Sequence, residues 1–140
     1  MYAKGHYYLY KKKNPFNHLI YPLPNSNGPG IHAGMDIENN LRFGPNAKWV
    51  DSIEYSFDEN TLDEFCNSIK SYWINFDPSC LTPDYTGIRS KIVAEGEGSQ
   101  DFEILDASDH GLENLIHLQG IDSPGLTSSL GIAAELIRKL

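Results

Sequence analysis

Alternation of apolar and polar residues marks the first half of the chain and predicts β-strands. Between residues 31 and 37 every second side chain is apolar, which is typical of a strand with one buried face. The prolines of the extended segment 18–24 suit a sheet edge or a strand end. The predicted elements of this half are strands at 3–10, 31–37 and 41–43, the extended segment 18–24, and turns at 25–30 and 39–40.

The pattern changes to a helical period after residue 60. Thr61-Leu62-Asp63-Glu64 has the sequence of a capping box, in which Thr61 and Glu64 satisfy each other's backbone donors. The helix is expected to end at 76–78. Its predicted apolar face comprises Leu62, Phe65, Cys66, Ile69, Tyr72 and Trp73.

Short strands and a second helix are predicted for the rest of the chain. Strands are expected at 84–94, 101–107 and 115–118, the first two separated by a glycine-rich turn. A final helix is expected from about residue 124 to residue 140. Its predicted buried stripe comprises Leu126, Leu130, Ala133, Ile137 and Leu140.

This succession predicts an α+β fold with a mostly antiparallel sheet and two main helices, in a single domain over residues 1–140. The formal net charge of −8 argues against a nucleic-acid partner, which requires a clustered basic surface. The chain has neither the start of a signal peptide nor an apolar run long enough to span a membrane, so a cytoplasmic protein is expected.

The cysteines and histidines of the chain do not have the spacing of several common classes of site. Cys66 and Cys80 make neither a zinc pattern nor a redox pair, and both are expected to be reduced thiols, with Cys66 on the buried face of its helix. The histidines show no ligand spacing with carboxylates, so no metal site is predicted. No nucleophile elbow is present.

The segment 116–130 carries the strongest functional signal. It indicates a short strand, a glycine turn, and a helix start with Ser123 as N-cap and Pro124 at the first helical position. Gly125 leaves that first turn bare, and a bare helix start favours an electron-rich ligand. The alternative is an ordinary Ser-Pro helix cap with no ligand.

Six segments together resemble one known family: FNHLIYPLP (16–24), GPGIHAGMD (28–36), LRFGPNAKWVD (41–51), LTPDYTGIRSKI (81–92), DFEI (101–104) and LIHLQGIDSPGLTSSLGIA (115–133). They resemble the C-terminal part of FAD-dependent oxidoreductases of the D-amino-acid-oxidase superfamily, in the L-2-hydroxyglutarate dehydrogenase/oxidase branch. The resemblance runs over nearly the whole chain.

The resemblance implies most of a substrate domain, followed by a flavin-facing strand and helix at about 115–140. The glycine-rich dinucleotide fingerprint of the family's N-terminal half is absent from this sequence. We therefore expect weak FAD binding or none by this chain alone. The residues implied to face the flavin are Gly120, Ser123, Gly125, Leu126 and Thr127, with the backbone donors coming from Gly125, Leu126 and Thr127.

The resemblance also points to substrate-binding residues. Arg89 would bind a substrate carboxylate with its planar guanidinium, the alternative being a surface arginine in a salt bridge. His32 would take a hydroxyl proton, the alternative being a structural strand histidine. Tyr21 is a weaker pocket candidate. The family usually carries a bulkier, often hydroxylated residue where Gly34 stands, which leaves the shape of the pocket open.

The activity implied is oxidation of a small 2-hydroxy acid, similar to L-2-hydroxyglutarate, by hydride transfer to FAD. A separate N-terminal FAD-binding segment would be the partner, and the chain alone would be inactive. The alternative is a non-catalytic truncated or interaction module that self-associates through the surface meant for that segment.

Overall fold

The computed structural model describes residues 1–23, 30–98 and 100–139. These residues form two compact units. One unit comprises 3–88, and the other comprises 1–2 together with 89–140. The architecture is α+β with antiparallel strand pairs, as predicted.

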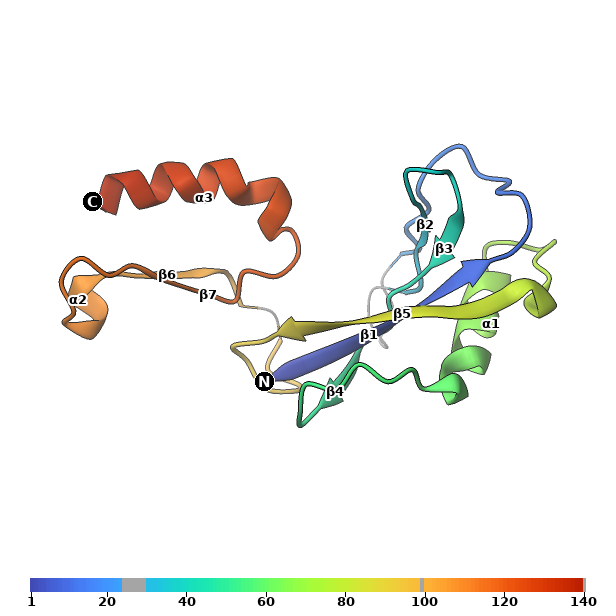
Figure 1. The fold of residues 1–140 in the computed structure, drawn as a ribbon, viewed down its shortest axis with the longest axis horizontal. Coiled ribbons are helices and arrows are strands. Elements are labelled where there is room, and N and C mark those ends of the chain that lie inside the picture. The colour runs from blue at the N-terminus through green and yellow to red at the C-terminus, as the bar shows by residue number, and fades with distance from the viewer. Residues whose placement is uncertain (24–29, 99, 140) are drawn as a thin grey trace. The chain divides into compact units, whose positions relative to one another are not determined.

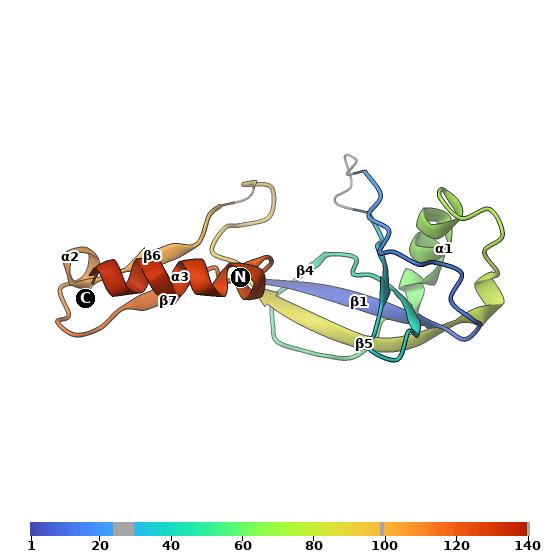
Figure 2. The ribbon, with the colours of Figure 1, turned by 90° about the horizontal axis from the view of Figure 1, so that it is seen from above.

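The 3–88 unit is a sheet with one helix, α1 (Leu62–Lys70), on one of its faces (Figures 1 and 2). The strands run in the order β2-β3-β1-β4, and β5 also pairs with β1. Tyr8 lies opposite Phe43, and Gly34 lies opposite Arg42. The strands are β1 (Tyr2–Tyr10), β2 (Ala33–Met35), β3 (Leu41–Phe43), β4 (Lys48–Val50) and β5 (Leu81–Ser90).

The core lies between α1 and the sheet and is largely aromatic. Tyr8 packs on Phe65 with ring centroids 4.6 Å apart, and Trp73 packs on Phe76 at 5.6 Å. Cys66 is buried and both cysteines are free thiols, as expected. The buried cluster comprises Tyr8, Tyr10, Ile31, Ala33, Leu41, Phe43, Phe65, Cys66, Ile69 and Phe76.

The predicted capping box is wrong. Thr61 has helical backbone angles and lies in the short 3-10 helix Glu59–Thr61, which Asp58 caps. The Thr61 hydroxyl instead donates to the Asp58 carbonyl at 2.7 Å, and Glu64 accepts from Asn46. The helix also ends earlier than expected, at Lys70, and Leu62 is exposed. A second 3-10 helix, Pro78–Cys80, leads into β5.

In the first half of the chain, the extended segment 18–24 and the strand 31–37 form less sheet than their sequence pattern predicts. The extended segment 18–24 contributes one bridge, Ile20 with Ala33, because its prolines remove backbone donors. Ile37 was expected on the buried face of β2, but β2 ends at Met35 and Ile37 is fully exposed. Residues 25–29 of the predicted turn, together with residue 24 at the end of the extended segment, lie outside the described part of the chain.

The second unit is a two-stranded ribbon with α3 (Gly125–Lys139) alongside it (Figures 1 and 2). β6 (Glu103–Leu105) pairs antiparallel with β7 (His117–Gln119), and Ile104 lies opposite Leu118. The ribbon ends in the short helix α2 (Ala107–His110), which was not predicted. Asp106 and Asp109 form a capping box there.

Four of the five residues of the predicted buried stripe of α3 are exposed, and the fifth, Leu140, lies outside the described part of the chain. Leu126, Leu130 and Ile137 expose 91%, 85% and 73% of their surface, and Ala133 is also exposed. The opposite side of α3, with Gly125, Ile132 and Leu136, is the less exposed one. The helix is thus apolar on two sides, and only one side is covered by its own unit.

Candidate functional site

Two predicted site residues meet on the 3–88 unit. The Tyr21 and His32 rings lie 4.2 Å apart between centroids and are inclined by 45°. The bridge between Ile20 and Ala33 explains this contact, because residues next to an antiparallel bridge fall opposite one another. Tyr21 is exposed and His32 is half-buried, so the pair is reachable from solvent.

The His32 side chain shares a sheet face with Gly34 and Arg42. Residues 32 and 34 alternate with the buried Ile31 and Ala33, and Gly34 lies opposite Arg42. A Cβ built on Gly34 would find its nearest neighbour, the Arg42 carbonyl oxygen, at 3.9 Å. The position therefore has room for a side chain that this sequence does not supply.

Sequence reasoning missed Arg42, which stands at the centre of this face. Its Nη1 donates to Asp36 at 2.8 Å and its Nε donates to Asp84 at 2.6 Å. The Asp84 carboxylate raises the pKa of Arg42, while hydrogen bonds from Asn40 lower the pKa of Asp36. Because two carboxylates already pair with this guanidinium, Arg42 has a structural role and is not a binding site for an anionic ligand.

Arg89 is exposed near the end of β5. No hydrogen bond or carboxylate partner of its guanidinium is found in the part of the chain that the structure describes. Arg89 belongs to the 89–140 unit, whereas Tyr21 and His32 belong to the other unit.

Two glycines allow the compact turn before α3. Gly120 has φ +67°, and a Cβ there would lie 2.9 Å from Ile92 Cδ1. A Cβ on Gly125 would lie 2.7 Å from Ile121 Cγ2. Lys91 forms an ion pair with Asp122 and holds the middle of the turn.

The helix start differs from the prediction in its details. α3 begins at Gly125, so Pro124 precedes the helix, and no hydrogen bond of the Ser123 hydroxyl appears within the described ranges. The expected Ser123 cap is therefore wrong. The Gly125 N–H donates to the Asp122 carbonyl at 2.5 Å, which removes it from the expected donors.

The N–H groups of Leu126 and Thr127 remain as donors at this end. They lie in the first turn of α3, where the helix itself provides no acceptor. No other acceptor for them is found among residues 1–23, 30–98 and 100–139. Unpaired N–H donors at a helix start can bind an electron-rich ligand edge, which is the chemistry that the resemblance implies for the flavin ring.

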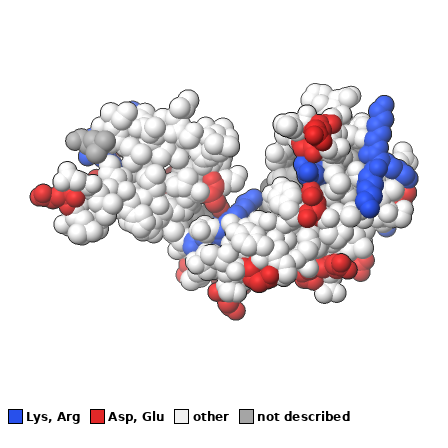
Figure 3. Space-filling view, in the orientation of Figure 1, with Lys and Arg blue, Asp and Glu red and all other residues white. Residues whose placement is uncertain are grey.

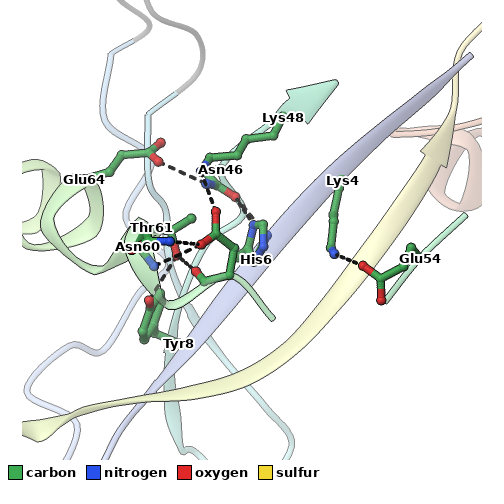
Figure 4. A network of polar contacts seen from close by, with 10 residues as sticks. Lys4, His6, Tyr8, Asn46, Lys48, Glu54, Asn60, Thr61 and Glu64 are labelled. Carbon is green, nitrogen blue, oxygen red and sulfur yellow. Dashed lines mark hydrogen bonds and ion pairs between the residues drawn. The ribbon is translucent and has the colours of Figure 1, made fainter. Parts of the chain in front are cut away.

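A separate polar network stabilises the interior of the 3–88 unit (Figure 4). Asn46 Oδ1 accepts from the His6 backbone N–H at 2.9 Å and contacts His6 Nδ1 at 3.0 Å. Asn46 Nδ2 donates to Glu64 at 3.0 Å. The Tyr8 hydroxyl meets the Thr61 hydroxyl at 3.0 Å, and burial raises the pKa of Tyr8. These buried contacts join α1 to the sheet, so the network is structural.

The part of the chain described by the structure contains no group of three or more His, Cys, Asp or Glu side chains placed to hold a metal ion. In the same residues, no helix combines the length and apolar character needed to cross a membrane. On the face of α3 and the β6–β7 ribbon that Figure 3 shows, most of the surface belongs to uncharged residues.

A family model described as "FAD dependent oxidoreductase" matches residues 1–139. The chain belongs to this family. The mitochondrial L-2-hydroxyglutarate dehydrogenase of Arabidopsis thaliana is 34% identical over 150 residues, which cover 99% of this chain and 31% of that enzyme. The resemblance stated from the sequence is thereby confirmed.

Two further relatives of the chain are named for glycerol 3-phosphate. The glycerol 3-phosphate oxidase of Mycoplasma genitalium is 30% identical over 98% of this chain and 35% of its own length. The glycerol 3-phosphate dehydrogenase of Caloramator mitchellensis is 28% identical over 96% of the chain and 27% of its own length. The chain thus spans about a third of the length of the curated relatives it matches.

Proposed function

We propose that this chain is the substrate-binding portion of an FAD-dependent oxidoreductase that oxidises a small 2-hydroxy acid similar to L-2-hydroxyglutarate. The observation that carries the proposal is the Tyr21–His32 pair on an accessible sheet face. The similarity to the Arabidopsis dehydrogenase supports the substrate class. Bound FAD would accept a hydride from the substrate carbon.

The side chains have distinct roles in this proposal. His32 accepts the proton of the substrate hydroxyl, and the Tyr21 ring restricts the orientation of the imidazole. Arg89, which has no carboxylate partner in the described part of the chain, binds a substrate carboxylate. The N–H groups of Leu126 and Thr127 would hold the electron-rich edge of the flavin, and Gly120 lets the backbone pass close to it.

The test is a chimera in which this chain replaces the matched 150 residues of the Arabidopsis enzyme, assayed by dye reduction with L-2-hydroxyglutarate. We expect His32→Gln to lower kcat by about 100-fold or more. Arg89→Gln should raise KM by roughly 10- to 100-fold, because a charged hydrogen bond is lost. His18→Gln and Arg138→Gln, at exposed positions, are the matched controls.

Two results would contradict the proposal. Faster turnover of glycerol 3-phosphate than of the hydroxy acid would move the chain to the substrate class of its other relatives. A folded, FAD-loaded chimera without turnover of either compound would favour the non-catalytic module.

A further inference from the structure

The sheet face that carries His32 also carries a stacked pair of tyrosines. Tyr7 of β1 and Tyr85 of β5 lie 4.4 Å apart between ring centroids, and their ring planes are inclined by 15°. Tyr7 alternates with the buried His6 and Tyr8, so its side chain lies on the face away from the core. The pair is therefore a second aromatic feature of the face on which His32 lies.

Gly44 connects the tyrosine pair to His32. Its N–H donates to the His32 carbonyl at 3.0 Å, so the two backbone segments are neighbours. A Cβ built on Gly44 would lie 2.8 Å from Tyr7 Cδ1, because the Tyr7 ring lies over this glycine. An aromatic row thus crosses the sheet and comprises Tyr21, His32, Tyr7 and Tyr85.

The polar side chains beside the aromatic row carry a net negative charge. Asp84 precedes Tyr85 in β5, and its carboxylate accepts from Arg42 at 2.6 Å. Asp36 accepts from the same guanidinium at 2.8 Å. A further carboxylate placed here would meet two negative charges and one positive charge that they already share.

Gly34 leaves open space between His32 and Arg42. It follows His32 by two residues on the same face and lies opposite Arg42. A Cβ built there would have its nearest neighbour at 3.9 Å, so nothing fills the position. The surroundings of His32 thus combine aromatic surface, open space and negative charge.

We infer that Tyr7 and Tyr85 bind the side chain of the substrate, and that this side chain is uncharged, either aliphatic or aromatic. The inference rests on the proposed function, because His32 has to hold the hydroxyl group for the side chain to reach the tyrosines. Ring faces attract apolar and aromatic groups, whereas the carboxylates on Arg42 repel a second substrate carboxylate. Among the 2-hydroxy acids of the proposed class, those with an uncharged side chain are the preferred substrates.

Two substrates compared in the FAD-loaded chimera test the inference. L-2-hydroxyisocaproate has an uncharged side chain, and L-2-hydroxyglutarate carries a carboxylate at the end of its side chain. We expect kcat/KM to be at least ~10-fold higher for L-2-hydroxyisocaproate. Tyr85→Ala should lower that value by about 10-fold and leave the value for L-2-hydroxyglutarate unchanged. Tyr85 exposes 48% of its surface, so the fold does not depend on its ring.

Asp84→Asn tests the electrostatic part of the inference. The variant removes one of the two carboxylates that pair with Arg42 and leaves Asp36 in place. KM for L-2-hydroxyglutarate should fall by about 10-fold, while KM for L-2-hydroxyisocaproate stays unchanged. A purely structural role of this ion pair would change both KM values alike and would overturn the inference.

Tyr55→Ala is the matched control, since it removes another exposed tyrosine ring of the same unit. An equal loss for both acids in Tyr85→Ala would overturn the inference. A higher kcat/KM for L-2-hydroxyglutarate than for L-2-hydroxyisocaproate in the unmodified chimera would also overturn it, and both results leave the proposed function standing. A folded, FAD-loaded chimera that oxidises neither acid contradicts the proposed function itself and the inference with it.

Discussion

Two glycines of α3, one at its first position and one in its middle, face different constraints. Gly125 has Ile121 Cγ2 2.7 Å from the position of a Cβ, whereas Gly131 has open space. A methyl group at Gly125 forces the turn to shift, while a methyl group at Gly131 only improves helix propensity.

We therefore expect Gly125→Ala to lower the free energy of unfolding by about 1–3 kcal/mol and Gly131→Ala to raise it by up to about 1 kcal/mol. Urea titrations followed by circular dichroism measure both. A Gly125→Ala variant as stable as the wild type would show that the turn before α3 does not need glycine.

On the sheet face that carries His32, the sequence allowed individual candidate residues to be predicted, but it did not allow their contacts to be predicted. His32 and Tyr21 each stood out from the sequence, but their meeting depends on the Ile20–Ala33 bridge. Arg42 was missed because one of its partners, Asp84, lies 42 residues further along the chain. Local periodicity carries no information about such a pair.

In two helices, contacts with neighbouring segments override a pattern that the local sequence does contain. Thr61 and Glu64 have the spacing of a capping box. Asp58, however, caps the 3-10 helix that precedes α1, and the Glu64 carboxylate accepts a hydrogen bond from Asn46 instead. In α3 the predicted stripe has helical spacing, yet the side that packs within the unit is the other one. A sequence pattern finds an apolar side of a helix, and only the neighbouring elements decide which side is covered.

The loop segment 54–56 makes a pH-dependent contribution to the free energy of unfolding. Hydrogen bonds from the Ser56 hydroxyl and backbone N–H, and then from Lys4, lower the pKa of Glu54 from 4.5 to about 2. A carboxyl whose pKa is lowered on folding stabilises the fold fully above its unfolded pKa. That contribution is lost as the pH falls from about 4.5 to about 2.

We expect Glu54→Gln to flatten the fall of unfolding free energy with pH over that window and to leave the remaining acid dependence unchanged. Denaturant titrations at a series of pH values measure the slope. Glu113→Gln, at an exposed position, is the control. An unchanged slope in Glu54→Gln would show that the Ser56 and Lys4 contacts do not persist in solution.

The buried hydrophobic residues are unevenly divided between the two units. Every residue of the buried hydrophobic cluster lies in the 3–88 unit. Among residues 1–2, 89–98 and 100–139, Gly125 alone is buried. The sequence predicted strands and helices in both halves, but their similar patterns gave no sign that one half would lack a core.

We expect the amide protons of α3 to exchange with solvent at least ~10-fold faster than those of α1 in the isolated chain, because local opening of α3 exposes little additional apolar surface. Hydrogen exchange with mass spectrometry resolves the two helices. Equal protection of both helices in the isolated chain would contradict this expectation.

The exposed apolar side of α3, with Leu126, Leu130 and Ile137, also has a consequence for the cell that makes this chain. Chaperones and proteases act on exposed apolar segments of incompletely assembled proteins. A copy with an uncovered α3 should therefore be cleared faster than a copy in which the helix is covered.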